Sequence, residues 1–370
     1  MKKVILRTTA ISALCLGALS AQAADPIELN ISGFMKQWVG YTEHSINKLS
    51  RWNYSNVGTY SDAEIYFSGS TKLDNGLSVG VMMETERSGG TSDGNTDESY
   101  GWISSDSYGK IQVGRTDNVS TEMAYKARDV GIGLNKGDVE EWRPSAQFAT
   151  DVAYTTALVG SSLEIQPPGI HYYSPVFNGF QFGFSHLISA TESQEGSYSP
   201  KRSAQAFALS YSGEWNDLKI GADLSKVQKR YVSDRNFYRA GLDLEYEGFS
   251  LSGSYKRTSN LEDRNATTGY AASIFDGQTW EAGLGYETGP YSVTAAYLSG
   301  IYDANSTVSG AKSDLNIAMI SGAYDLGAGV TFRGSVFRYD VNGYGVNDIS
   351  SSTIVDNISK GVVLGMEVAF

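Results

Sequence analysis

The chain has 370 residues, of which 19% are charged and 12% are aromatic, and its formal net charge is −12. The 41 glycines exceed the usual share of about 7%, and the charged fraction lies below the usual ~25%. An acidic chain lacks the basic patch of nucleic-acid binders, so we expect no nucleic-acid partner. Abundant Gly and Tyr with only 7 Pro favour strands and turns over helices, and the frequent aromatic residues argue against disorder.

Residues 1–23 have the pattern of a secretory signal peptide. Basic residues precede a short apolar core from Ala10 to Leu19, and Ala21-Gln22-Ala23 has the small-x-small form of a cleavage site. The apolar core is too short to span a bilayer as a helix. Cys15, the only cysteine, would leave with the signal, so we expect neither a disulfide nor a cysteine-bound metal in the mature domain, residues 24–370.

The dominant pattern in the rest of the chain is an alternation of apolar and polar residues over stretches of about 9–13 residues, which predicts strands. Near the C-terminus, for example, Val362, Leu364 and Met366 lie on one face, whereas the other face is mainly Gly, Glu and Ala. Sixteen strands are predicted, over residues 27–42, 60–73, 77–87, 97–104, 109–116, 169–175, 179–188, 203–215, 218–230, 236–247, 249–257, 278–288, 290–300, 313–325, 329–340 and 359–370.

Short turns such as Asn75-Gly76 alternate along the chain with long connections, and this asymmetry is typical of an outer-membrane barrel. An even number of strands also suits antiparallel closure with both termini on one side. A ring of sixteen strands is too wide for side chains to fill, so we expect a water-filled lumen, with the apolar faces of the strands on lipid. The predicted fold is therefore all-β, a transmembrane antiparallel β-barrel of 16 strands that forms a single domain.

The alternation also assigns charged side chains to the lumen. The acidic set is larger than the basic set, which predicts an accumulation of cations in the lumen. The alternative is that charges near the strand ends are merely solvated. The acidic candidates are Glu64, Glu84, Glu86, Asp223, Asp243, Glu245, Glu247, Glu281, Glu287 and Glu367, and the basic candidates are Lys36, Lys72, Lys219, Arg239, Lys256 and Arg333.

Residues 117–168 form a connection of about 50 residues, much longer than an ordinary hairpin loop. The loop contains aromatic residues that can pack, and it is long enough to fold into the lumen and narrow it; the alternative is an extracellular flap. The acidic residues that we expect to line this constriction are Asp117, Glu122, Asp129, Asp138, Glu140 and Glu141. Acidic loops also offer oxygen ligands for Ca²⁺, although no EF-hand pattern is present, and no other cofactor is expected.

Three segments resemble those of Gram-negative general porins, and most closely the porins of alphaproteobacteria. The segment from Asp62 to Gly80 resembles their second hairpin, and the segment from Tyr108 to Arg115 resembles the strand that leads into their constriction loop. The segment from Gly169 to Gly183 resembles the hairpin after that loop, and the terminal Phe370 resembles the aromatic end that the outer-membrane assembly machinery recognises.

The resemblance implies a 16-stranded barrel in the bacterial outer membrane, in contact with the lipid bilayer and lipopolysaccharide. Porins of this type are usually homotrimers that pass small hydrophilic solutes by diffusion, and their third loop folds inward to form a constriction.

The resemblance also implies roles for residues of the pore wall. It places Arg115 at the constriction, although strict alternation with Ile111 and Val113 would turn this side chain outward. Lys36 resembles a wall lysine of the first strand, whereas Glu64 stands where some relatives carry an arginine. The Pro-Glu-Phe-Gly-Gly-Asp loop motif of enterobacterial relatives is absent. With the alternation pattern, the expected pore-wall residues are Lys36, Glu64, Lys72, Glu84, Arg115 and Arg333.

Catalytic motifs are weak in this sequence. The segment from Gly76 to Gly80 matches the nucleophile-elbow pattern around Ser78, but it follows an Asn-Gly turn and enters a strand rather than a helix. None of the 3 histidines has a serine two residues away, as the resemblance to barrel phospholipases would require. We therefore predict a passive, cation-preferring porin and not an enzyme. The alternatives are a plugged structural or adhesive surface barrel and a substrate-specific channel.

Overall fold

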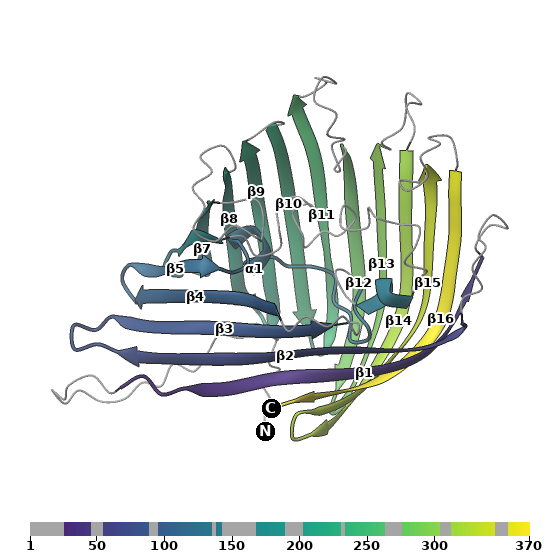
Figure 1. The fold of residues 1–370 in the computed structure, drawn as a ribbon, viewed down its shortest axis with the longest axis horizontal. Coiled ribbons are helices and arrows are strands. Elements are labelled where there is room, and N and C mark those ends of the chain that lie inside the picture. The colour runs from purple at the N-terminus through teal and green to yellow at the C-terminus, as the bar shows by residue number, and fades with distance from the viewer. Residues whose placement is uncertain are drawn as a thin grey trace.

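The computed structural model is a closed barrel in which every strand pairs with its neighbours in the sequence and the first strand pairs with the last (Figure 1). The structure describes residues 26–45, 55–88, 95–134, 138–142, 168–188, 203–230, 234–262, 276–303, 312–344 and 354–370. The expected all-β barrel of sixteen antiparallel strands is confirmed. The predicted signal peptide lies outside the described residues.

The strands differ from the predicted ones mainly in length. The strands β11 (Phe249–Glu262) and β16 (Ile354–Ala369) extend further into the long connections than the alternation pattern indicated, because pairing with their neighbours continues there. The sixteen strands are β1 (Asn30–His44), β2 (Val57–Lys72), β3 (Ser78–Ser88), β4 (Asn95–Ser105), β5 (Gly109–Arg115), β6 (Pro168–Tyr173), β7 (Phe180–Leu187), β8 (Ser203–Trp215), β9 (Leu218–Arg230), β10 (Asp234–Tyr246), β11 (Phe249–Glu262), β12 (Gly277–Thr288), β13 (Tyr291–Asp303), β14 (Lys312–Gly327), β15 (Val330–Tyr344) and β16 (Ile354–Ala369).

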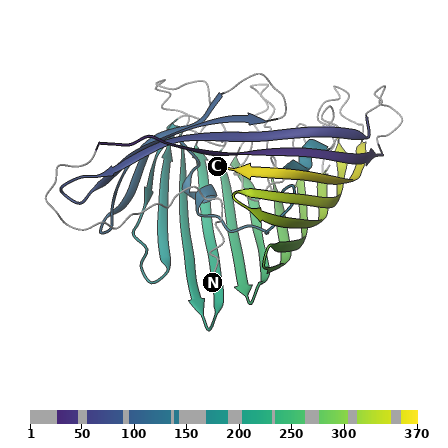
Figure 2. The ribbon, with the colours of Figure 1, turned by 90° about the horizontal axis from the view of Figure 1, so that it is seen from below.

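Closure of the barrel brings β1 against β16, and Figure 2 shows these two strands side by side in purple and yellow. The register runs antiparallel from Phe34 opposite Ala369 to His44 opposite Ser359. Backbone hydrogen bonds of 2.9 and 3.0 Å between Gly33 and Phe370 extend the pairing to the last residue. Closure leaves no edge strand with unpaired N–H and C=O groups, which is the condition for a sheet to cross a membrane.

The short turns have the backbone geometry that tight hairpins need. Asn216 and Asp217 between β8 and β9 have φ values of 47° and 65°, and Glu247 and Gly248 between β10 and β11 have φ values of 47° and 85°. Positive φ at both central residues matches the right-handed twist of the flanking strands. Both turns were predicted from their residue types.

The outer face of the barrel is largely apolar. Met35, Val39, Leu224, Leu284 and Leu364 are all exposed on it. Aromatic pairs lie where strands meet the short turns: the ring centroids of Phe249 and Tyr286 are 4.5 Å apart, and those of Tyr291 and Tyr324 are 5.0 Å apart. This arrangement agrees with an apolar band bordered by interfacial aromatic residues.

The inner face is less polar than the alternation pattern indicated, because both faces of some strands are apolar. On β14, Leu315, Ile317 and Met319 are buried inside the barrel, while Ile320 on the outer side is exposed. The three buried residues of β14 pack in one apolar group with residues of the neighbouring strands, and we call this group the β13–β1 cluster. Its members are Leu315, Ile317, Met319, Leu298, Phe337, Tyr339, Val341, Val363 and Trp38. Its apolar side chains need a cover inside the lumen, and the long loop provides that cover.

No helix in the described part of the chain is long and apolar enough to cross a membrane.

Candidate functional site

The loop after β5 runs inside the barrel (Figure 1). Its described residues, 116–134 and 138–142, include a short helix α1 (Val119–Glu122) and a 3₁₀ turn η1 (Asp138–Trp142). Asn118 caps α1, since its side chain accepts a hydrogen bond of 2.9 Å from the backbone N–H of Ser120. The first half of this loop therefore has a defined structure, and its contacts show which part of the barrel wall it covers.

The helix α1 packs against the inner face of β6 to β10. Val119 and Met123 contact a buried group that includes Leu187, Ala206 and Phe237. The backbone N–H of Val119 also donates a hydrogen bond of 3.0 Å to the Ser185 hydroxyl. Alanines on the inner face of β8 leave the space that the helix occupies, so small residues on this strand determine where the loop begins its path.

Beyond α1, the loop is held by carboxylates of the wall. The backbone N–H of Tyr125 donates a hydrogen bond of 2.7 Å to Asp223, and that of Ala127 donates one of 3.0 Å to Glu281. The fully buried Arg239 guanidinium donates to both Asp223 and the carbonyl oxygen of Tyr125. These wall carboxylates are thus engaged by the loop and by Arg239.

Arg128 makes the most extensive polar contact between the loop and the wall. Its Nε and Nη2 atoms donate to the two carboxylate oxygens of Asp243 at 2.9 and 2.6 Å, and Nη2 also donates to Glu245 at 3.0 Å. Glu245 forms a further ion pair with Lys219. Cationic groups therefore neutralise much of the negative charge on this side of the lumen.

The next part of the loop is fixed to β13 and β15. Asp129 folds back onto its own loop, because its carboxylate accepts hydrogen bonds from the N–H groups of Gly131 and Gly133 at 3.1 and 2.7 Å, and one of 3.2 Å from the Thr294 hydroxyl. Arg333 donates a hydrogen bond of 2.8 Å to the carbonyl oxygen of Val130. Asp129 and Arg333 thus stabilise the path of the loop.

The loop then meets the β13–β1 cluster. Ile132, Leu134, Val139 and Trp142 are buried against it. Gly40 on β1 leaves room for the Trp142 ring, since a Cβ atom at this glycine would lie only 2.5 Å from the Cζ3 atom of Trp142. The described loop therefore follows the wall from β6 round to β1.

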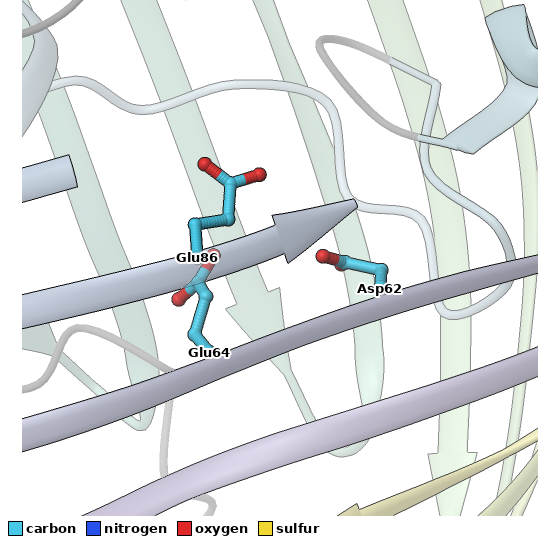
Figure 3. A group of neighbouring side chains, drawn as sticks. All are labelled: Asp62, Glu64 and Glu86. Carbon is cyan, nitrogen blue, oxygen red and sulfur yellow. The ribbon is translucent and has the colours of Figure 1, made fainter. Parts of the chain in front are cut away.

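A row of carboxylates lines the inner face of β2 and β3. One carboxylate oxygen from each of Asp62, Glu64 and Glu86 lies within 4.8 Å of the other two (Figure 3), and Glu84 lies on the same face of β3. Lys36 on β1 pairs with Asp62 at 2.7 Å, and the Tyr66 hydroxyl donates a hydrogen bond to Glu64. We call Asp62, Glu64, Glu84 and Glu86 the acidic wall.

The other residues expected at the site have different surroundings. Lys72 lies exposed at the end of β2, and Glu141 is exposed at the end of the described loop. Glu140 lies partly buried in η1. The residue Asp138 begins η1, but its side chain lies outside the described part of the structure.

Arg115 is the last residue of β5, opposite Ser99 on β4 and Pro168 on β6. The register gives it the same side of the strand as the exposed Ile111 and Val113. Its Nε atom is inaccessible to solvent and has no hydrogen-bond partner among the described residues. The place of Arg115 at the constriction stays a prediction.

Among the described residues, the charged residues of the inner face that the sequence reasoning missed include Asp62, Glu98 and Lys110. Asp62 precedes Glu64 by two residues and so shares its face of β2, which is a signal that the alternation pattern contained. Glu98 precedes Tyr100 by two residues, and Lys110 precedes Gln112 by two residues. The side chains of Tyr100 and Gln112 also face the lumen. Short strands with few apolar residues made these assignments hard to recognise.

A closed barrel with an apolar outer face, a charged lumen and a long loop folded inside it defines a channel-forming protein of the bacterial outer membrane. A family model described as Gram-negative porin matches residues 9–344, and the chain belongs to this family.

Solved structures share the fold. An anion-selective porin from Comamonas acidovorans matches 93% of this chain and 100% of its own, with 15% identity and a TM-score of 0.62. OmpT, an outer membrane protein of Vibrio cholerae solved in a trimer form, matches 94% of this chain and 100% of its own, with 12% identity and a TM-score of 0.61. No match was found among curated protein sequences.

Proposed function

We propose that this porin passes small hydrophilic solutes and ions by passive diffusion, without a catalytic step, and that it prefers cations. The observation that carries this proposal is the uneven distribution of charge in the lumen. On the β9–β12 side, Asp223, Asp243 and Glu245 are engaged by arginine, lysine and loop N–H groups. On the β2–β3 side, four carboxylates stand together, and Lys36 pairs with one of them.

A negative wall attracts cations because it lowers their energy in the narrow part of the lumen. The effect is strengthened where a low-dielectric barrel focuses the field, and a ring or row of carboxylates is a common device of cation channels. Since the loop covers the opposite side, solutes pass between the loop and the acidic wall. We therefore place the selectivity on the wall carboxylates rather than on the loop acids Asp129, Glu140 and Glu141.

We also propose a homotrimer that contacts the lipid bilayer and lipopolysaccharide. The trimer form of the Vibrio cholerae protein with the same fold supports this assembly. The apolar, aromatic-bordered outer face supports the lipid contact.

Liposome swelling tests the channel function. Liposomes containing the purified protein are expected to swell in solutions of small neutral sugars at rates that fall with solute size and rise linearly with concentration. Cationic solutes are expected to enter faster than anionic solutes of equal size. A plugged barrel would give no swelling, and a substrate-specific channel would give rates that saturate.

A further inference from the structure

A second group of carboxylates lies at the start of the loop, on elements other than the strands β2 and β3 of the acidic wall. Glu98 comes from β4, Asp117 follows the end of β5, and Glu122 ends α1. One carboxylate oxygen from each lies within 4.8 Å of the other two. We call these three residues the loop-foot cluster. Three like charges at this spacing repel one another strongly and need a compensating proton or cation.

Two hydrogen bonds and one ammonium group lie among the described surroundings of this cluster. The Oε1 atom of Glu98 accepts hydrogen bonds of 3.2 Å from the Thr116 hydroxyl and 3.1 Å from the N–H of Asp117. Lys110 brings one positive charge into the range of Glu122, and its Nζ atom also lies 5.0 Å from the centre of the Tyr173 ring.

A separate observation points to a ligand at the same place. Tyr173 on β6 is only 7% exposed, and its hydroxyl is inaccessible to solvent and has no hydrogen-bond partner within the described part of the chain. The hydroxyl lies within electrostatic range of Glu122, Asp117 and Glu98. A buried hydroxyl normally has a partner, so an unpaired one beside a carboxylate group indicates a bound ion or its coordinated water.

We propose that Glu98, Asp117 and Glu122 bind a divalent cation, with Ca²⁺ as the ion that fits best. Ca²⁺ takes six to eight oxygen ligands, with carboxylates among the preferred ones, in a flexible geometry that three carboxylates from different elements can supply. Mg²⁺ demands near-ideal octahedral geometry and is usually held by only one or two carboxylates together with several waters. The Tyr173 hydroxyl pairs with an ion-bound water or with the ion itself.

The bound ion would link β4 to the start of the loop, which the hydrogen bonds of Glu98 also connect. Its ligands come from the wall at β4, from the junction after β5 and from α1. Binding therefore holds the first turn of the loop against β4, in addition to the strands that α1 already contacts. The acidic wall carries no such inference, because Asp62 and Glu64 already have Lys36 and Tyr66 as partners.

Calcium titration of the full-length protein tests this site. The protein, purified in detergent and stripped with EGTA, is titrated with CaCl₂ or MgCl₂ in an isothermal calorimeter. We expect one Ca²⁺ per chain, Mg²⁺ binding at least about tenfold weaker, and weakening of Ca²⁺ binding by about tenfold or more in Glu122→Gln and in Asp117→Asn. Glu64→Gln, in the acidic wall, is the matched control and is expected to bind as the wild type does.

Two outcomes would overturn the proposal: no saturable Ca²⁺ binding to the wild type, or wild-type binding by both Glu122→Gln and Asp117→Asn. Tyr173→Phe tests the contribution of the hydroxyl separately from that of the carboxylates, because it removes the hydroxyl and retains Glu98, Asp117 and Glu122. It is expected to weaken Ca²⁺ binding without abolishing it. Heat-modified mobility of each variant on gels shows whether its barrel is folded, and the wild-type titration alone decides the proposal if every cluster variant misfolds.

Discussion

Arg128 on the inward loop and Asp243 on β10 form a two-pronged ion pair, with N···O distances of 2.9 and 2.6 Å. The pair joins a residue of the loop to a strand 115 positions later in the chain. Two parallel N–H···O bonds give such a pair direction as well as strength. This contact fixes the loop against the wall and also removes negative charge from that side of the lumen.

Replacing Arg128 by Gln is expected to increase cation preference, because Asp243 and Glu245 then lose their guanidinium partner. The barrel is also expected to lose about 1–3 kcal/mol of unfolding free energy, as is typical for hydrogen bonds to charged groups. Bilayer reversal potentials and urea unfolding measure the two effects. Lys312→Gln, which removes an exposed charge at the start of β14, is the control. An unchanged reversal potential in Arg128→Gln would show that these carboxylates do not influence the permeating ions.

Trp142 tests whether apolar packing holds the far end of the described loop. Its side chain is 6% exposed against β1 and the β13–β1 cluster, so Trp142→Ala is expected to cost about 3 kcal/mol and to loosen the loop. Single-channel recordings are expected to show larger and noisier conductance. Trp215→Ala removes an equally large side chain that is 68% exposed, and it should leave the open-channel noise unchanged. Equal noise in the two variants would argue against this packing role.

Shortening the loop is expected to raise conductance. Removing part of residues 122–142 deletes chain that lies against the inner wall, so the free cross-section of the lumen increases. Single-channel conductance in 1 M KCl is the measurement. Conductance equal to that of the wild type would indicate that the segment does not narrow the pore, as expected for an extracellular flap.

The raised pKa of Glu122 predicts that the ion selectivity of the pore depends on pH. Desolvation first, and then the charge of Glu98, raise the pKa of Glu122 to about 7, while Lys110 acts in the opposite direction. The carboxyl is therefore neutral well below pH 7 and negative well above it. Cation preference measured in EGTA is expected to fall on acidification from pH 8 to pH 6, and the change should be smaller in Glu122→Gln.

The raised pKa of Glu122 also determines the direction in which its contribution to stability changes with pH. Because the pKa is raised above the ordinary value of 4.5, the folded state binds this proton more tightly than the unfolded state. The contribution of Glu122 to unfolding free energy is thus greatest below pH 4.5 and is lost as pH rises through 7. Wild-type pH profiles that coincide with those of Glu122→Gln, in both selectivity and stability, would contradict this assignment.

The strands could be predicted from the sequence because lipid and water on the two faces of a barrel impose a period of two. That pattern is local, so it identified all sixteen strands and the turns at Asn216-Asp217 and Glu247-Gly248. The path of the loop depends on contacts between residues far apart in the chain, such as Trp142 with Gly40 and Val130 with Arg333. No local pattern encodes those contacts.

The inner apolar surface shows the same limit. Leu315, Ile317 and Met319 alternate with residues that are also partly apolar, so the alternation pattern does not show which side of β14 faces the lumen. That side is covered by the loop, which is distant in the chain. Arg115 illustrates a different case: the family resemblance places it at the constriction, whereas alternation with Ile111 and Val113 places it outward, and its role at the constriction stays a prediction.

The acidic wall is expected to make the lumen cation-preferring. The zero-current potential across a planar bilayer under a KCl gradient tests it most directly. We predict the sign of a cation-selective pore, reduced in a Glu64→Gln/Glu84→Gln/Glu86→Gln variant and kept in the control Glu214→Gln, a residue exposed near the end of β8. An anion-selective sign for the wild type, or a triple variant with unchanged potential, would contradict the account.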